Sequence, residues 1–195
     1  MDETREIREK IKQAAIKRFS TYGFGKTTMA EIGCDCNMSA ANLYNFYKNK
    51  QDIAAATVED HFADEHRAYK EIARQTNLAP PEKIRAFVNK SIDITAGCVK
   101  THDKIFELLE FISKERKDLI EAHIEQKKSI LAEILAEGNR TGDFNVSNIL
   151  QTAHAVLKAF VYFNYPAFMV NTPEEETREI ANDVVDLILK GLYTR

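Results

Sequence analysis

The sequence predicts an all-α protein, and three observations support this fold class. Only 7 Gly and 4 Pro occur among 195 residues, so few positions would break a helix. Apolar residues recur every three or four positions over long stretches, which is the spacing of an amphipathic helix. The alternation of apolar and polar residues that is typical of strands is rare. We therefore expect helices throughout, with residues 1–49 forming one domain and residues 50–195 a second.

Residues 4–22 predict the first helix, because apolar side chains follow one face from Ile7 to Tyr22. Gly23 would end this helix, since glycine readily adopts the left-handed conformation found after a helix. Thr28 begins the second helix. Glu31 follows three residues later and completes a capping box, in which each of the two side chains bonds the backbone N–H of the other residue.

The third helix is predicted to start after Ser39, because serine is a good N-cap residue. Asn37 lies in the break between the second and third helices, where asparagine tolerates a left-handed backbone. Asn49 and Asp52 repeat the capping pattern at the start of a longer helix. The resulting arrangement is helix, sharp turn, helix.

The longer helix is predicted over residues 50–75, and it stops at a break with two prolines, residues 77–81. After this break the pattern is helix after helix. The predicted ranges are 82–99, 103–114, 117–139, 146–169 and 173–193.

The third helix has the features of one that enters a DNA major groove. Its first residues are small, so the backbone can approach the bases, and Asn42 and Asn45 share a face because they are three positions apart. Asparagine pairs bidentately with adenine, and alanine contacts the thymine methyl group. Tyrosine and lysine side chains, with backbone N–H groups at helix starts, would hold the flanking phosphates. The predicted DNA-binding set is Thr27, Thr28, Ser39, Ala40, Ala41, Asn42, Tyr44, Asn45, Lys48 and Lys50.

The charge distribution agrees with a DNA partner for the first domain. Residues 1–50 carry 9 Lys/Arg against 6 Asp/Glu, a net charge of +3, whereas the remainder carries 18 against 24, a net charge of -6. A basic end on an acidic body can orient toward DNA. We expect the binding to weaken strongly as salt increases.

Several residues of the first quarter follow a known family pattern: Phe19, Gly23, Phe24, Thr27, Thr28, Ile32, Met38, Ser39, Leu43, Tyr44, Tyr47 and Lys50. With them the stretch resembles the DNA-binding domain of the TetR family of transcriptional repressors. The chain departs from the family at Asn37, where glycine is usual, and at Asn42, where Thr or Ser is usual. The resemblance implies a homodimer that binds a palindromic operator on double-stranded DNA and is released by a small-molecule effector.

The last two predicted helices favour a dimer. Residues 154–163 are apolar nearly all round, and the final helix has an apolar side from Ile180 to Leu192. A helix that is apolar on two sides must be covered twice. The second cover would be the same surface of another subunit, giving a two-fold interface of four helices, as in TetR-like proteins. The alternative is a central core helix in a monomer.

Polar residues among aromatic ones predict a small-molecule site in the second domain, because an apolar pocket with a few polar anchors is the usual form of such sites. The predicted ligand-binding set is Phe106, Glu110, Phe111, His123, His154, Lys158 and Tyr162. This lining would suit a flat or amphipathic organic molecule, with a carboxylate or with an acyl chain. No cofactor is expected. No metal is expected either, since Glu110 and His123 lack a histidine pair at helical spacing.

Three cysteines, Cys34, Cys36 and Cys98, cannot form a fully paired disulfide set, and no second pair completes a zinc site around the C-x-C motif. We interpret them as small filler residues. No apolar run approaches 18 residues, and the first 20 residues are charged throughout. We therefore expect a cytoplasmic protein with no membrane span and no signal peptide.

Two other function classes were weighed against a DNA-binding regulator. A helical enzyme would act in the second domain, but the sequence has no nucleophile elbow, metal-ligand spacing or glycine-rich phosphate loop. A protein-interaction module would place the helix-turn-helix on another protein, which the polar tip and the nearby lysines disfavour. The residues alone favour a helix-turn-helix with a helical partner domain and not an enzyme, and the resemblance to the TetR family implies a ligand-responsive transcriptional repressor.

Overall fold

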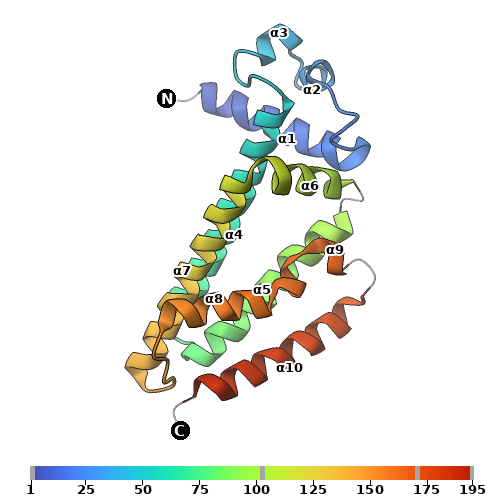
Figure 1. Ribbon diagram of the computed structural model, residues 1–195. Coiled ribbons are helices and arrows are strands. Elements are labelled where there is room, and N and C mark those ends of the chain that lie inside the picture. Colours follow the sequence, from blue (N-terminus) through green and yellow to red (C-terminus); the bar gives the residue numbers. More distant parts are fainter. Residues whose placement is uncertain (1–2, 102–103, 170–171, 194–195) are drawn as a thin grey trace. The chain divides into compact units, whose positions relative to one another are not determined.

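The computed structural model describes residues 3–101, 104–169 and 172–193, and in these ranges the regular secondary structure is helical (Figure 1). The all-α prediction is therefore confirmed. The elements are α1 (Glu3–Tyr22), α2 (Met29–Asp35), α3 (Ala40–Leu43), α4 (Lys50–Arg74), α5 (Pro80–Thr101), α6 (Ile105–Glu115), α7 (Lys117–Thr141), α8 (Ile149–Ala159), the 3-10 helix η1 (Val161–Asn164), α9 (Pro166–Met169) and α10 (Glu174–Leu192).

The chain forms two compact units. The first contains Met1–Ala63 and Lys100–Ile120, and the second contains Asp64–Val99 and Glu121–Arg195. Helices α4 and α7 each contribute residues to both units. The domain boundary expected between residues 49 and 50 falls inside the first unit, at the start of α4.

The first unit is built around the short helices α2 and α3. Its core is formed by side chains from α1, α2, α3, α4 and α6, with Phe19, Ile32, Leu43 and Ile53 fully buried. Helix α6 joins this core through Ile105, Leu108 and Ile112. Burial of such large apolar side chains stabilises the unit by roughly 1.5 to 3 kcal/mol for each side chain.

The predicted helix starts are confirmed at atomic detail. Thr28 and Glu31 form the full capping box, with the Thr28 backbone N–H donating to Glu31 Oε2 at 2.8 Å. Ser39 Oγ accepts from the Asn42 backbone N–H at 3.1 Å. Asn49 Oδ1 caps α4 by accepting from the Asp52 N–H at 2.7 Å. These caps fix where each short helix begins and thereby fix the turn between them.

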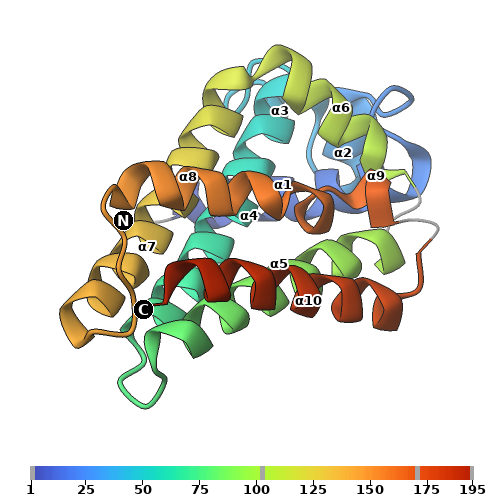
Figure 2. The ribbon, with the colours of Figure 1, turned by 60° about the horizontal axis from the view of Figure 1, so that its bottom comes forward.

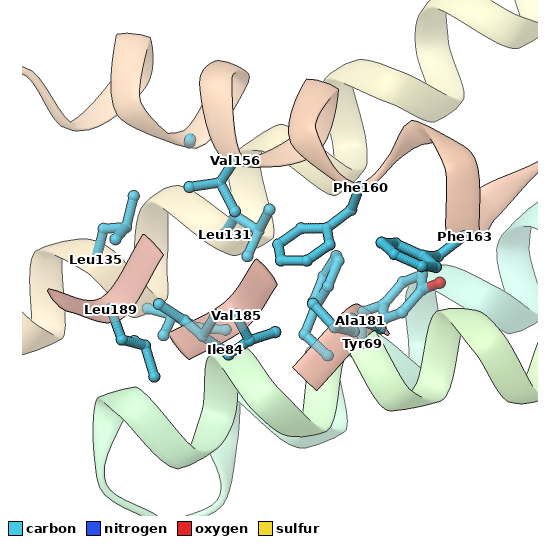
Figure 3. Close-up of a cluster of buried hydrophobic side chains, with 14 of the residues drawn as sticks. Tyr69, Ile84, Leu131, Leu135, Val156, Phe160, Phe163, Ala181, Val185 and Leu189 are labelled. Atoms are coloured by element: carbon cyan, nitrogen blue, oxygen red, sulfur yellow. The ribbon is translucent and has the colours of Figure 1, made fainter. Parts of the chain in front are cut away.

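The second unit has a separate apolar core, contributed by α4, α5, α7, α8, α9 and α10. Helices α5 and α10 lie side by side in both ribbon views (Figures 1 and 2), and Arg178 on α10 pairs with Asp93 on α5 at 2.5 Å. Figure 3 shows Tyr69, Phe160 and Phe163 gathered at one end of this core.

The helix predicted over residues 146–169 is wrong in its extent. Asn148 caps α8, which ends at Ala159, and two short elements follow it. Proline lacks a backbone N–H and disfavours a helical residue before it, so Pro166 prevents one continuous helix. The predicted start at residue 103 lies outside the described residues. In the described ranges no helix has both the length and the apolar character needed to cross a membrane.

Candidate nucleic-acid interface and effector site

The turn between α2 and α3 brings the two short helices close together. Asn37 has a positive φ of 57°, as its predicted left-handed role requires. The Met38 backbone N–H donates to the Gly33 carbonyl at 2.8 Å, and a Cβ added at Gly33 would lie 2.9 Å from the Met38 carbonyl oxygen. Only glycine fits this approach without a backbone shift. Gly33 is not among the predicted site residues, although a glycine inside a predicted helix is a signal for close backbone contact.

The tip of α3 presents two amides to the surface. Asn45 Nδ2 donates to Asn42 Oδ1 at 3.3 Å, which confirms that the two residues share a face. Ala41, Asn42, Tyr44 and Asn45 are exposed. The α-helix ends at Leu43, and the chain continues as a tighter turn in which the Asn45 N–H donates to the Asn42 carbonyl at 3.1 Å.

Two residues of the predicted DNA-binding set have internal roles. Thr27 is 2% exposed and its hydroxyl donates to the Gly23 carbonyl at 2.9 Å. Lys50 Nζ donates to the carbonyls of Phe24, Gly25 and Thr27 at 2.8, 3.1 and 2.9 Å. These bonds inside the unit hold the loop that precedes α2.

The rest of the predicted set remains at the surface or beside it. Thr28, Ser39 and Lys48 are exposed, and Ala40 is half-buried. Arg18 holds the end of α2 from α1, with Nε donating to Asp35 Oδ2 at 2.6 Å, and this guanidinium lowers the pKa of the Asp35 carboxyl. The candidate interface is therefore the exposed polar tip of α3, on helices that side-chain contacts such as Arg18–Asp35 hold together.

Helix α6 contacts the loop before α2 directly. Glu107 Oε2 accepts from the Gly25 backbone N–H at 3.0 Å, and a Cβ at Gly23 would meet the same carboxylate at 2.7 Å. Gly23 has a φ of +94°, a backbone conformation that favours glycine. The Phe111 ring packs on Phe24 with centroids 4.6 Å apart. Glu107 is not among the predicted site residues.

The three predicted ligand residues on α6 lie in the first unit. Phe111 packs against its core, and Phe106 is half-buried. Glu110 is exposed and accepts from Lys114 Nζ at 2.5 Å, a contact that lowers the pKa of the Glu110 carboxyl. The second unit holds the other four predicted ligand residues: His123, His154, Lys158 and Tyr162.

Among those four, His123 belongs to a half-buried polar cluster. Its Nδ1 lies 2.9 Å from His66 Nε2, the two rings stack, and its Nε2 lies 3.7 Å from Glu65 Oε2. Burial lowers the pKa of His66. The other three residues lie at the surface. His154 and Lys158 are exposed on α8, and the exposed Tyr162 contacts Thr172 Oγ1 through its hydroxyl at 3.2 Å.

One turn along α7 from His123, the unit buries a lysine that the predicted ligand set omits. Lys127 is 5% exposed, and its Nζ donates to Asn164 Oδ1 at 2.9 Å and lies over the Tyr69 ring at 4.9 Å. Burial lowers the pKa of this ammonium to about 8. The signal in the sequence was a lysine four residues before Leu131, on the apolar face of its helix.

The surface of α8 and α10 and of the segment between them exposes large apolar side chains. Leu150 is 62% exposed on α8 and Leu187 is 67% exposed on α10. The others are Val161, Tyr162, Tyr165, Phe168 and Ile180. In the described part of the chain no group of three or more His, Cys, Asp or Glu side chains is placed to hold a metal ion.

Comparison with known proteins gives two matching family models. Residues 11–57 match the bacterial regulatory proteins of the tetR family, and residues 80–185 match the tetracyclin repressor-like C-terminal domain. The uncharacterized HTH-type transcriptional regulator YerO of Bacillus subtilis (strain 168) is 27% identical over 79 residues, which are 40% of this chain and 27% of that protein. The matched part is thus about a quarter of the relative's length.

Solved structures of similar fold cover nearly the whole chain. A transcriptional regulator from Cytophaga hutchinsonii has a TM-score of 0.72 at 21% identity, covering 95% of this chain and 98% of its own. FadR of Thermus thermophilus, a TetR family transcriptional repressor in complex with lauroyl-CoA, has a TM-score of 0.65 at 20% identity, covering 96% of both chains. At these identities the likeness shows the fold.

Proposed function

Because the chain belongs to the TetR family of bacterial transcriptional regulators, we propose that it is a repressor that binds a palindromic operator as a homodimer and is released by a small organic effector. The observation that carries this proposal is the exposed pair of amides, Asn42 and Asn45, at the tip of α3.

Asn42 is proposed to read a base, and Asn45 to orient it. The Asn45 amide donates to Asn42 Oδ1 and so sets which way the Asn42 amide points. Asn42 Nδ2 and the second lone pair of Oδ1 then remain for the acceptor and donor of an adenine edge. Ala41, which is exposed next to it, is small enough to let α3 approach and to contact a thymine methyl group.

Phosphate contacts are assigned to the exposed side chains around this tip. Tyr44 and Lys48 project beside α3, and Thr28 and Ser39 stand at the starts of α2 and α3. Such contacts position a protein on DNA without reading sequence. Lys50 is left out of this group, since its ammonium bonds three carbonyls of its own unit.

The dimer is proposed to form through α8 and α10. Leu150 and Leu187 leave most of their side chains in water in the single chain, which is costly for apolar surface of this size. A two-fold pairing of this surface would bury the same residues on both subunits. Two equivalent α3 helices then match the two halves of a palindrome.

Release by an effector requires a ligand that binds one conformation better than another. Helices α4 and α7 supply residues to both units, so a rearrangement of either helix around a ligand in the second unit would also act on residues of the first. The complex of Thermus thermophilus FadR with lauroyl-CoA is a precedent for an organic effector on this fold.

DNA binding tests the proposal. The full chain is titrated against a fluorescent duplex from the region upstream of its own gene and against a shuffled duplex of equal length, each at two salt concentrations. Binding should be selective for the first duplex, weaken strongly with salt, and saturate at an even number of chains per duplex.

Two variants separate recognition of the base sequence from contact with the phosphates. Asn42→Ala should cost about 1 to 3 kcal/mol on the preferred duplex and relax the preference, whereas Lys48→Ala should weaken both duplexes about equally. Asn77→Ala, at an exposed loop position of the second unit, is the matched control and should change neither. Equal binding of all duplexes by the unchanged protein, or an Asn42→Ala variant with unaltered preference, would contradict the assigned role of α3.

A further inference from the structure

The second unit holds a buried positive charge with no ion-pair partner among the described residues. Among the lysines whose side chains the structure describes, three are buried: Lys12 at 8% exposure, Lys83 at 2% and Lys127 at 5%. Lys12 pairs with Asp60 and with Glu9, and Lys83 Nζ lies 2.6 Å from Glu137 Oε2. For Lys127 no carboxylate of the described residues lies within 4 Å of Nζ. Of these three described lysines, Lys127 is therefore the one without a carboxylate at close range.

The surroundings of Lys127 compensate this charge only in part. Nζ donates one hydrogen bond, to Asn164 Oδ1, whereas an ammonium has three N–H donors. The ring faces of Tyr69 and Phe87 lie 4.9 and 6.0 Å from Nζ and attract it weakly. Glu65 favours the charged form from a greater distance. A buried charge held this way is strongly unfavourable unless an anion joins it.

The residue that bonds Lys127 sits on a short element. Asn164 is the last residue of η1, a single 3-10 turn that precedes Pro166, and its Nδ2 donates back to the Phe160 carbonyl at 2.7 Å. A turn of four residues is held by few hydrogen bonds, so it can rearrange at less cost than the long helices. The Asn164 amide oxygen therefore occupies a position that a ligand oxygen can take.

Aromatic rings lie beside the Lys127 ammonium, and the polar side chains of Glu65 and His66 lie farther along α4. Tyr69, Phe160 and Phe163 surround this end of the core (Figure 3), and the Tyr69 hydroxyl is already bonded to Ser91 Oγ at 2.8 Å. A ligand that reaches this position meets the Lys127 ammonium and the ring faces of Tyr69 and Phe87. The chemistry complementary to this surface is a single negative group on an apolar body.

We propose that Lys127 is the anion-binding residue of the effector site and that the effector is an organic monocarboxylate with a hydrocarbon or aromatic body. The carboxylate replaces the Asn164 oxygen and accepts hydrogen bonds from Nζ, and the body packs among the rings of the core. This assignment rests on the proposed function, since it names the class of effector that the second unit binds.

Calorimetric titration without DNA tests the assignment directly. The probes are decanoate and 1-naphthoate, each compared with its uncharged analogue, 1-decanol and 1-naphthalenemethanol. At least one acid should bind the unchanged protein about 10 to 100 times more tightly than its alcohol, the range expected for a hydrogen bond to a charged group. The proposal is overturned if neither acid is preferred over its alcohol.

Three variants locate the preference. Lys127→Met keeps the length of the side chain and should bring acid and alcohol to within about twofold, because the cation is removed. Asn164→Asp supplies an internal carboxylate beside Nζ and should abolish the preference with Lys127 intact. Lys128→Met is the matched control, since the neighbouring Lys128 pairs with Glu125 at 2.5 Å, and it should keep the preference. Circular dichroism and thermal melting check that each variant is folded, and survival of the preference in folded Lys127→Met overturns the proposal.

The preferred acid is then added to the complex with the operator duplex. Acid binding that depends on Lys127 without release of DNA supports the anion site and contradicts the effector role. Release of DNA by an alcohol that equals its acid supports the effector role and overturns the anion site.

Discussion

Lys50 in the first unit and Lys127 in the second are held in opposite ways. Each ammonium lies over an aromatic ring, Lys50 over Phe24 at 4.7 Å and Lys127 over Tyr69 at 4.9 Å. Burial lowers the pKa of both. Lys50 nevertheless uses all three of its N–H donors on backbone carbonyls, whereas Lys127 uses one donor on a side-chain amide.

The difference separates a structural lysine from one available to a ligand. The carbonyls that accept from Lys50 belong to the loop before α2, so the lysine fixes a surface that must be ready before DNA arrives. Preorganisation lowers the ordering cost of binding. Lys127 lacks such partners, and its charge makes the folded state less stable until a counter-ion binds. The buried ammonium of the first unit thus has all its hydrogen-bond partners within the unit, whereas under our proposal the ammonium of the second unit gains its partner from a bound anion.

Replacing Lys127 by Met gives the largest expected effect, and it is stabilising. The pKa of the lysine falls from 10.5 to about 8 on folding, so the charged form costs the folded state about 3 kcal/mol. Lys127→Met removes this cost and leaves the Asn164 oxygen without its donor, so the free energy of unfolding at pH 7 should rise by about 2 kcal/mol. Urea denaturation at fixed protein concentration measures it.

The free energies of unfolding of the unchanged protein and of Lys127→Met should depend differently on pH. Between pH 8 and pH 10.5 the unfolded chain binds a proton at Lys127 that the folded chain has lost. The free energy of unfolding of the unchanged protein therefore rises relative to Lys127→Met across this window, and the full penalty is present below it. The carboxylate of Glu65 raises the pKa of Lys127 and so opposes part of the lowering by burial. If the difference in free energy of unfolding between the two proteins stays constant from pH 7 to pH 10, Lys127 does not carry an unbalanced charge in the folded state.

Replacing Lys50 by Met is expected to act in the opposite direction. The carbonyls of Phe24, Gly25 and Thr27 would lose a shared donor, which should lower the free energy of unfolding by about 1 to 2 kcal/mol. The same urea titration measures this loss. Lys48→Met, at an exposed neighbouring position, should leave the free energy of unfolding within about 0.5 kcal/mol. A Lys50→Met variant as stable as the unchanged protein would show that water replaces the ammonium at those carbonyls.

The sequence predicted those parts of the fold and the site that depend on neighbours along the chain. The capping box of Thr28, the cap at Ser39 and the shared face of Asn42 and Asn45 all follow from spacings of three residues. Such local rules hold because the groups involved can reach one another whatever the rest of the chain does.

Contacts between distant residues could not be predicted in the same way. Lys50 reaches carbonyls 23 to 26 positions earlier, and Glu107 reaches the backbone of Gly25 from 82 positions away. Helical periodicity says which face is buried and does not say against what it packs. For this reason the sequence does not show that Lys50 bonds the loop before α2, that Phe111 packs on Phe24, or that Lys127 lies over the Tyr69 ring.

The smallest expected effect concerns the turn on which the DNA-reading surface depends. Asn37 has a φ of 57°, a conformation that costs a residue with a Cβ roughly 1 kcal/mol unless, as in asparagine, the side chain tolerates it. Asn37→Ala should therefore lower the free energy of unfolding by about 1 kcal/mol, and Asn37→Gly should leave it unchanged or raise it slightly. Urea denaturation of the two variants gives the comparison.

Because the turn belongs to the preorganised first unit, Asn37→Ala should also weaken operator binding, and Asn37→Gly should not. Equal stability of the alanine and glycine variants would mean that the turn changes its backbone when the side chain changes, in which case the first unit is less rigid than its hydrogen bonds indicate.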